Sequence, residues 1–444
     1  MKLNHRSFAY ALAAAVLSFS AAPVQAMGIL EVQDLALASD PQLLAAQARS
    51  DAAGAGKLGA WSNFLPQLSG NRSRSRTYNQ NQSTAFRDTS GIKFVSQSWS
   101  LRADLSLFRW SNFAQLDRAE WSKAQGRANY AAAYQDFLVR VATIYFGVLG
   151  AEDNLNFARS EEKAIGRQLD QAKQRFDVGL TAVTDVHEAQ ASFDAAQART
   201  IVAENALDDA YEGLRELTGE QIKHVDGLVD DIPLLRPDPE KIETWVDTAV
   251  AGNPGIATRM AAKKIAEADI EVARSGYFPT VDLNFQRQSG QRGGVFGGST
   301  TDNSVGISIN VPIFTFGKVT SQVRVAAFNA DAADQDLVQQ QRLVRRQTRN
   351  NYRQVVADIS QVQARKQAVV SAQSALDATQ AGFEVGTRTI VDTLLSQRQL
   401  YDAQRQYAQA RYDYLLAVLK LKQSAGNLGV GDTRHIQRLL TSTH

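Results

Sequence analysis

The chain contains no cysteine, and this absence excludes disulfide bonds, thiolate metal sites, cysteine nucleophiles and a lipid anchor on an N-terminal cysteine. Histidine is scarce as well, and the few present are scattered along the chain: His5, His187, His224, His435 and His444. No metal-ligand spacing, catalytic-triad order or phosphate-binding loop stands in the sequence. We therefore expect neither an enzyme nor a bound cofactor or metal ion.

Long hydrophobic runs are confined to the N-terminus. Two basic residues precede the apolar run Phe8–Phe19, and Val24-Gln25-Ala26 fits a secretory cleavage site. The apolar core of about 12 residues is shorter than the roughly 20 residues that span a bilayer as a helix. The pattern predicts that residues 1–26 are an export signal peptide that is removed.

The rest of the chain holds no segment with the character of a transmembrane helix. The best candidate, residues 137–151, is about 15 residues long and contains Arg140. Loss of the two basic residues of the export signal lowers the 48 basic residues to 46, which equals the 46 acidic residues. A neutral chain gives no electrostatic case for a nucleic-acid partner. If the protein crosses a membrane, strands must do it.

One motif occurs twice, as RFDVGLTAVTD at residues 175–185 and as GFEVGTRTIVD at residues 382–392. The copies lie about 207 residues apart, a period too long for a solenoid repeat. In each copy a glycine separates two long heptad-patterned segments, which is typical of the tip of a helical hairpin. The chain is therefore interpreted as a tandem duplication.

The duplication divides the mature chain. The expected segments are a first structural repeat of helices, two strands and a long hairpin (27–219), an irregular equatorial segment (220–239), a second repeat (240–426) and a short C-terminal tail (427–444). Three prolines in residues 220–239 interrupt any helix there.

Each repeat carries a pair of candidate strands, the first pair interrupted by a predicted solvated loop at residues 79–97. Apolar and polar residues alternate over residues 98–107, 281–286 and 305–311, so each strand has one apolar and one polar face. A soluble sheet packed on a core is one interpretation. We favour membrane strands because the heptad-patterned helices leave none to cover a sheet. Aromatic residues near the strand ends are candidates for interfacial girdles: Trp99, Phe108, Trp110, Tyr277, Phe278, Phe314 and Phe316.

Four strands cannot close a barrel alone. Two chains would give eight strands and a filled interior, whereas three would give twelve and a hollow one. The helical pattern from Phe113 to Arg175 covers roughly 60 residues, or about 90 Å, and the returning segments alternate small and large residues at the seam. The expected fold is mainly α with membrane β: a duplicated repeat gives four strands per chain to a trimeric 12-stranded barrel, continued by a long antiparallel α-helical coiled-coil tunnel.

These features resemble the TolC family of outer-membrane efflux proteins over nearly the whole mature chain. The resemblance is carried by the duplicated strand pairs, by Val311-Pro312-Ile313-Phe314 before a helix, by residues 176–181 and above all by residues 385–392. It implies a homotrimer in the outer membrane of a Gram-negative cell, in contact with outer-membrane lipid, with its helical tunnel in the periplasm. Its implied function is the exit duct of a tripartite efflux or type I secretion system. The implied partners are a periplasmic adaptor (membrane fusion) protein and an inner-membrane RND or ABC pump.

The resemblance also implies a closed periplasmic end, held by links between the hairpins and between protomers. The matching positions are Asp185 and Gln168 in the first hairpin, and Phe383, Arg388, Asp392 and Leu395 in the second. Arg388 would offer a planar fork of donors to Asp185, and three Asp392 carboxylates would form a ring at the constriction. Phe383 stands where the family typically has Tyr, and Leu395 where a second ring of Asp would be. From the residues alone, Asp185 and Arg388 would be read as helix-end capping or exposed ion pairing.

The hairpin tips are the expected adaptor contact: Val178, Gly179, Leu180, Thr181, Val385, Gly386 and Thr387. Two alternatives stay open on the sequence. A periplasmic coiled-coil adaptor without a pore would share the hairpins and be water-soluble, and a constitutively open porin would share the strands. The cargo is not specified by any motif.

Overall fold

The computed structural model describes residues 26–78, 83–84, 87–88, 93–293 and 297–441. The predicted export signal, residues 1–26, therefore lies outside the described residues except for its last position. The chain divides into two compact units. The first combines Met1–Pro41, Gln135–Ile242 and Arg349–His444, and the second combines Gln42–Tyr134 and Glu243–Thr348.

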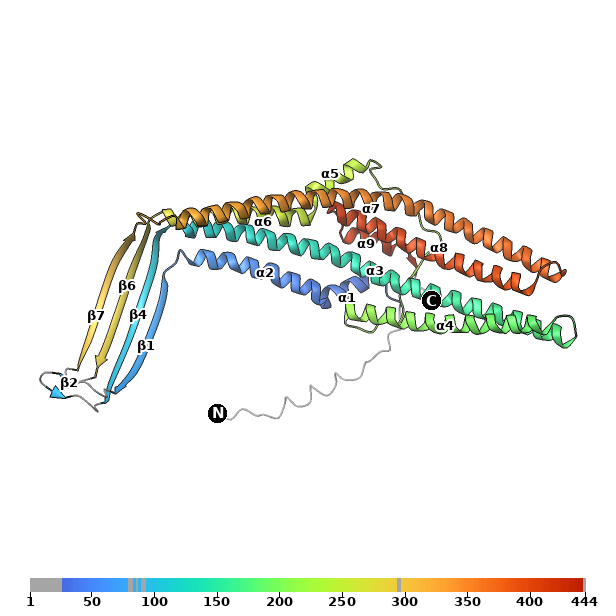
Figure 1. The fold of residues 1–444 in the computed structure, drawn as a ribbon, viewed down its shortest axis with the longest axis horizontal. Helices are drawn as coiled ribbons and strands as arrows, with labels where there is room; N and C mark the ends of the chain where they lie inside the picture. Colours follow the sequence, from blue (N-terminus) through green and yellow to red (C-terminus); the bar gives the residue numbers. More distant parts are fainter. Residues whose placement is uncertain (1–25, 79–82, 85–86, 89–92, 294–296, 442–444) are drawn as a thin grey trace, which may run out of the picture. The chain divides into compact units, whose positions relative to one another are not determined.

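Two helical hairpins dominate the fold, as predicted (Figure 1). Their helices are α3 (Trp110–Asp177), α4 (Val183–Thr218), α7 (Lys318–Glu384) and α8 (Ile390–Ala425). With 68 and 67 residues, α3 and α7 are each about 100 Å long at 1.5 Å per residue. The return helices α4 and α8 each have 36 residues, and both end at a glycine with positive φ, Gly219 and Gly426.

The first unit buries the seam residues that the heptad pattern indicates. The buried members on α4 are Ala196, Thr200, Ala203, Leu214 and Leu217, and those on α8 are Leu400, Ala410, Tyr414, Ala417 and Leu421. Small residues between the large ones let neighbouring helix backbones approach closely. The seam is therefore the hydrophobic core of the hairpins.

The two ends of the chain are folded into this unit beside the equatorial segment. Helix α1 (Ile29–Ser39) packs on α4 and on α9 (Val430–Gln437), and β5 (Gly227–Leu228) pairs with β8 (Leu440–Thr441). The fully buried Tyr145 donates its hydroxyl hydrogen towards the carbonyls of Met27 and Asp226, at 3.1 and 2.8 Å. The predicted tail thus contains a short helix and a strand.

A four-stranded antiparallel sheet forms part of the second unit. Its strands are β1 (Gln67–Tyr78), β4 (Lys93–Arg109), β6 (Thr280–Arg292) and β7 (Gly298–Asn310), in the order β1-β4-β6-β7. The two predicted strand pairs are confirmed and lie next to each other through β4 and β6. Strands β1 and β7 are the edges, and every residue of both is exposed.

The register gives the sheet an apolar face and a polar face. Cross-strand partners share a face, so Ala103, Phe285 and Val305 lie together on the apolar face, in one rung of paired residues. Ser100 and Gln288 lie on the polar face. A bulge between Ser106 and Phe108 shifts the alternation and brings Phe108 to the apolar face beside Val281.

Three further helices belong mainly to the second unit: α2 (Pro41–Ser62), α5 (Ile242–Gly252) and α6 (Pro254–Arg274), the last followed by the 3₁₀ turn η1 (Ser275–Tyr277). Asn253 caps α6 by accepting the Gly255 amide at 2.9 Å, with Pro254 at the first helical position. A buried cluster of Ala249, Ile256, Leu337 and Val344 packs α5 and α6 against α7.

The predicted loop at residues 79–97 is wrong at its end, because β4 already begins at Lys93. Within the same stretch β2 (Ser83–Thr84) pairs with β3 (Arg87–Asp88), and the remaining residues from 79 to 92 lie outside the described part. Over the described residues, none of the helices combines the length and the apolar character needed to cross a bilayer.

Candidate functional site

The predicted site lies at the two hairpin tips, which have the same turn. In the first, Gly179 has φ +77°, and the amides of Gly179 and Leu180 donate to the carbonyls of Phe176 and Arg175 at 2.9 and 2.8 Å. The second repeats this pair of bonds at the amides of Gly386 and Thr387. Both are Schellman motifs, and the positive φ explains the glycine in each copy of the motif.

Helix α8 begins with a capping box at the second tip. The Thr389 hydroxyl accepts the Asp392 amide at 3.2 Å, and the Asp392 carboxylate accepts the Thr389 amide at 2.9 Å. The Thr389 amide and the Thr389 hydroxyl, which also donates to the carboxylate at 2.9 Å, together with the charge of Arg388, hold the pKa of Asp392 below its usual range. Asp392, which the family resemblance predicts in a ring, is therefore the local cap of its own helix.

Helix α4 begins without such a cap. Its first residue is preceded by Ala182, which makes no side-chain cap hydrogen bond. Asp185, in the first turn, accepts a hydrogen bond from the Thr181 hydroxyl instead. Arg388 and Asp185 are not joined to each other, and no ion pair of Arg388 occurs among the described residues.

Arg388 lies across the end of α7. A Cβ atom at Gly382 would lie 2.7 Å from Cγ of Arg388, so a larger residue at this place would displace the Arg388 side chain. Both Arg388 and its neighbour Thr387 are exposed. Arg388 is therefore accessible from solvent.

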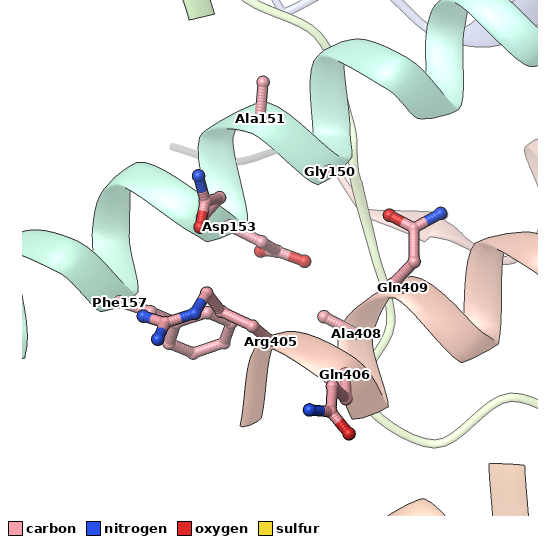
Figure 2. Close-up of a pocket in the computed structure, with 9 residues that line it drawn as sticks. Gly150, Ala151, Asp153, Phe157, Arg405, Gln406, Ala408 and Gln409 are labelled. Atoms are coloured by element: carbon pink, nitrogen blue, oxygen red, sulfur yellow. The ribbon is translucent and has the colours of Figure 1, made fainter. Parts of the chain in front are cut away.

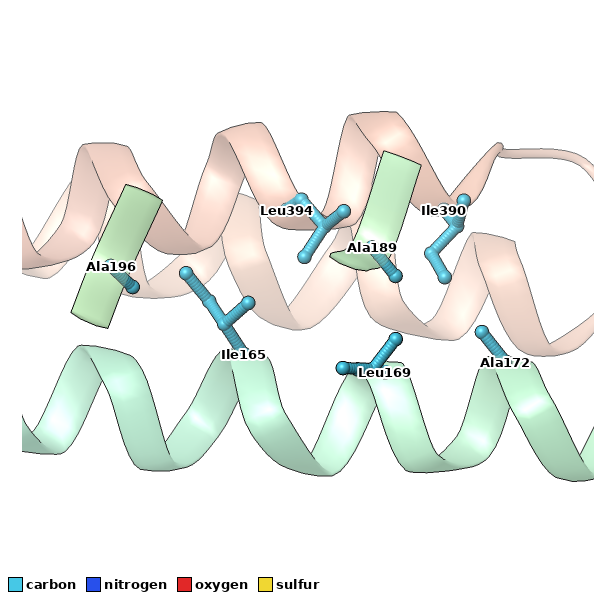
Figure 3. Close-up of a cluster of buried hydrophobic side chains, with 7 residues drawn as sticks. All are labelled: Ile165, Leu169, Ala172, Ala189, Ala196, Ile390 and Leu394. Atoms are coloured by element: carbon cyan, nitrogen blue, oxygen red, sulfur yellow. The ribbon is translucent and has the colours of Figure 1, made fainter. Parts of the chain in front are cut away.

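A buried apolar cluster holds the two hairpins together close to their tips (Figure 3). It joins Ile165, Leu169 and Ala172 of α3, Ala189 and Ala196 of α4, and Ile390 and Leu394 of α8. Phe383 packs against this cluster. The Arg175 guanidinium lies over the Phe383 ring, 4.7 Å from the ring centroid. Arg175 thus links the hairpins. The sequence analysis did not assign it a role, although it opens the first copy of the motif.

The two remaining predicted positions differ in burial. The side-chain oxygen of Gln168 is buried and has no hydrogen-bond partner within the described residues. Leu395 is 52% exposed. The two positions therefore differ, since one has a buried polar atom and the other an exposed apolar side chain.

A buried carboxylate further from the tips was missed by the sequence analysis. Glu161 of α3 is 1% exposed, and it accepts hydrogen bonds from Arg199 of α4 at 2.8 Å and from Arg405 of α8 at 3.2 Å. Arg405 also pairs with Asp402. One charge cluster therefore connects the first hairpin to the return helix of the second.

A hollow of about 360 Å³ lies between α3 and α8 near this cluster (Figure 2). Asp153 and Arg405 line it from opposite helices. Burial raises the pKa of Asp153, although the Tyr412 hydroxyl, at 2.7 Å, and Arg411 act in the opposite direction. Within the described ranges, histidine, aspartate and glutamate do not form any group of three suited to a metal ion.

Two pairs of long helices and an antiparallel sheet with an exposed apolar face are the architecture of a membrane channel with a helical tunnel. The family model of the outer membrane efflux proteins matches residues 32–220 and 245–427. The chain is 38% identical to the outer membrane protein TolC of Vibrio cholerae over 95% of this chain and 96% of that protein. It is 28% identical to the alkaline protease secretion protein AprF of Pseudomonas aeruginosa over 92% of this chain and 86% of that protein.

Solved structures show the same fold. The CmeC outer membrane channel of Campylobacter jejuni superposes with a TM-score of 0.74 at 16% identity, covering 93% of this chain and 90% of that chain. The chain belongs to the outer membrane efflux protein family. It is an outer-membrane exit duct for efflux or type I secretion. Family membership favours the duct over the adaptor without a pore, because the members of this family are channels.

Proposed function

We propose that three copies of this chain close a 12-stranded barrel in the outer membrane and continue it as a helical tunnel into the periplasm. One observation carries the proposal: the sheet exposes its apolar face and leaves both edge strands, β1 and β7, without a partner among the described strands. Val305, Ile307 and Ile309 on that face are each at least 66% exposed. Pairing β1 of one copy with β7 of the next would satisfy both edges.

The burial pattern of residues 95–100 of β4 supports a barrel with a polar interior. Ser96, Ser98 and Ser100 on the polar face are half-buried, whereas Val95, Gln97 and Trp99 on the other face are exposed. A sheet that curves around its polar face produces this difference. The polar face would then line the lumen, and the apolar face would meet lipid.

The hairpin tips form the proposed periplasmic gate. Its members are Asp185, Gln168, Phe383, Arg388, Asp392 and Leu395, as the family resemblance implies. The exposed Arg388, without an ion pair among the described residues, would bind Asp185 of the other hairpin or of a neighbouring copy. Leu395 and the unpartnered oxygen of Gln168 would then meet neighbouring chains at the closed end.

The tips themselves are the proposed contact for a periplasmic adaptor, which would couple the duct to an inner-membrane RND or ABC pump. Val178, Leu180 and Val385 are 69%, 77% and 75% exposed. Apolar side chains this exposed, next to rigid turns, suit a docking surface. The proposed role is transport rather than catalysis, and both efflux and type I secretion fit it.

The decisive experiment is single-channel conductance of the purified, detergent-extracted trimer in a planar bilayer. We expect a small conductance for the wild type and a larger one for Arg388→Ala, because the substitution removes the donor fork from the gate. Lys366→Ala is a matched control, since Lys366 pairs with Asp231 at 2.9 Å in the same unit, away from the tips. A water-soluble protein without conductance would overturn the duct, and equal conductance in wild type and Arg388→Ala would overturn the gate.

A further inference from the structure

A column of arginines on β1 has no role in the duct proposed above. Arg72, Arg74 and Arg76 alternate with serines and are exposed. Arg72 pairs with Trp99 in the register, and Arg76 pairs with Val95. All three therefore lie on the apolar face of the sheet, spaced by about 7 Å along the strand.

This basic column begins where the apolar rungs end. Leu68 on β1 lies in the same rung as Ala103, Phe285 and Val305. Gly70 follows in the next rung, and the arginines follow Gly70. The column therefore stands at the end of the sheet that carries the strand-connecting segments, away from the long helices.

Two further cations extend the basic column across the sheet. Arg287 of β6 lies on the same face and places its guanidinium 5.8 Å from the centroid of the Trp99 ring. Lys93 of β4 pairs with Tyr78 at the far end of the column. The apolar face carries no carboxylate in the described parts of the four strands.

The carboxylates of the sheet lie on the opposite face. Asp104, Asp282 and Asp302 belong to the polar face by register. There Asp282 accepts hydrogen bonds from Arg109 at 3.0 and 3.1 Å. Because the carboxylates lie on the other face, the column has no counter-ion among the described residues. The column nevertheless lies next to an apolar surface.

A hollow of about 600 Å³ adjoins the column. Arg72, Gln97, Ser289 and Gln291 line it together with the ring of Trp99. The polar groups of this lining can all donate hydrogen bonds, and Trp99 supplies an apolar wall. A phosphate attached to an acyl chain would meet donors in the hollow and apolar side chains one rung away.

We propose that the basic column and this hollow bind the phosphate groups of an anionic lipid in the leaflet that surrounds the loop end of the barrel. The inference rests on the proposed function, because the apolar face must meet lipid. Charge complementarity selects the occupant: clustered arginines beside an apolar belt attract phosphorylated headgroups at the membrane surface. In a trimer the site would occur three times, at the seam between β1 and the neighbouring β7.

The test compares lipid binding by two matched triple variants. One replaces Arg72, Arg74 and Arg76 by Gln. The other replaces Arg102, Arg109 and Arg292 by Gln and removes the same charge from the polar face. Delipidated trimers in detergent are titrated with diphosphorylated lipid A, and bound lipid is counted by native mass spectrometry.

We expect saturable binding of up to three lipids by the wild type and by the polar-face variant. The column variant should bind at least tenfold more weakly. Enzymatically dephosphorylated lipid A should bind weakly to the wild type, and inorganic phosphate at equal concentration should not displace the intact lipid. Equal binding by the column variant and the wild type, or equal binding of dephosphorylated lipid, would overturn the inference.

The same preparations separate this inference from the proposed duct. Conductance and trimer mass are measured for the wild type and for both variants. A conducting trimer with unaltered lipid binding in the column variant would contradict the lipid site and support the duct. A wild type that is neither trimeric nor conducting would overturn the duct and the lipid site with it, because the site needs a membrane-embedded sheet.

Discussion

The two hairpin tips turn in the same way but start their return helices differently. Gly179 and Gly386 occupy the same place in identical hydrogen-bonded turns. Asp185 and Asp392 also occupy the same place, three residues after the position that precedes the helix. Only the second tip has a capping box, because Thr389 stands where the first tip has Ala182.

Equivalent residues of a duplicated unit therefore need not have equivalent roles. Asp392 satisfies the first turn of α8 with its own carboxylate. Asp185 has no hydroxyl cap to pair with and contacts the side chain of Thr181 instead. The second tip is therefore stabilised by its own cap, whereas both tips pack through the shared apolar cluster.

The largest loss of stability should come from Glu161→Gln. This substitution would loosen both hairpins and so remove the difference between their tips. Glu161 is buried between Arg199 and Arg405, and removal of one partner from a buried ion pair costs about 3 kcal/mol at the lower end of the usual range. The lower end applies because both guanidiniums keep some contact with solvent. Denaturant unfolding of the detergent-solubilised protein measures the loss.

The neighbouring Glu162→Gln is the matched control for this substitution, since Glu162 is only half-buried. We expect it to change the unfolding free energy by less than about 0.5 kcal/mol, as surface substitutions usually do. If the two variants unfolded alike, the buried cluster would not be what ties the hairpins together.

Thr389→Ala is expected to have an intermediate effect and to make the second tip resemble the first. Loss of a threonine cap typically costs about 1 kcal/mol, and here it frees the Asp392 amide. Hydrogen-exchange mass spectrometry over the first turn of α8 should show faster exchange. Thr181→Ala is the control, because the Thr181 hydroxyl contacts a side chain and no backbone amide; comparable acceleration at the first tip would contradict the assigned difference.

Much of this architecture follows from sequence patterns, because both hairpins and strands bury or expose residues with a fixed period. Heptads with a glycine between them locate the tips, and alternation locates the sheet. Glu161 escapes such reasoning, since a single glutamate in a long helix has the same pattern whether it faces water or two arginines. The start of β4 at Lys93 was missed because Phe94 and Val95, the two apolar residues of 93–97, are adjacent and therefore show no alternation.

The contacts between the repeats also could not be predicted from the sequence. Arg175 and Phe383 stand about 208 residues apart, and a cation over an aromatic ring has no spacing rule that would reveal it. The same holds for Tyr145, which joins Met27 to Asp226. Local periodicity predicts elements, whereas these contacts depend on how the elements pack.

The smallest expected effect is a pH dependence that distinguishes the start of α8 from the start of α4. The folded-state pKa of Asp392 lies below the ordinary value because the Thr389 amide and hydroxyl and the charge of Arg388 favour the carboxylate. A lowered pKa means that the unfolded chain binds the proton first, so the contribution of this group is complete above the ordinary pKa of about 3.9 and is lost as pH falls through the lowered value. Exchange at the first turn of α8, corrected for the intrinsic rate, should therefore stay slow at pH 5 and accelerate only in stronger acid. Asp392→Asn should remove this dependence, and an acceleration centred above the ordinary aspartate pKa would show that another group controls the start of α8.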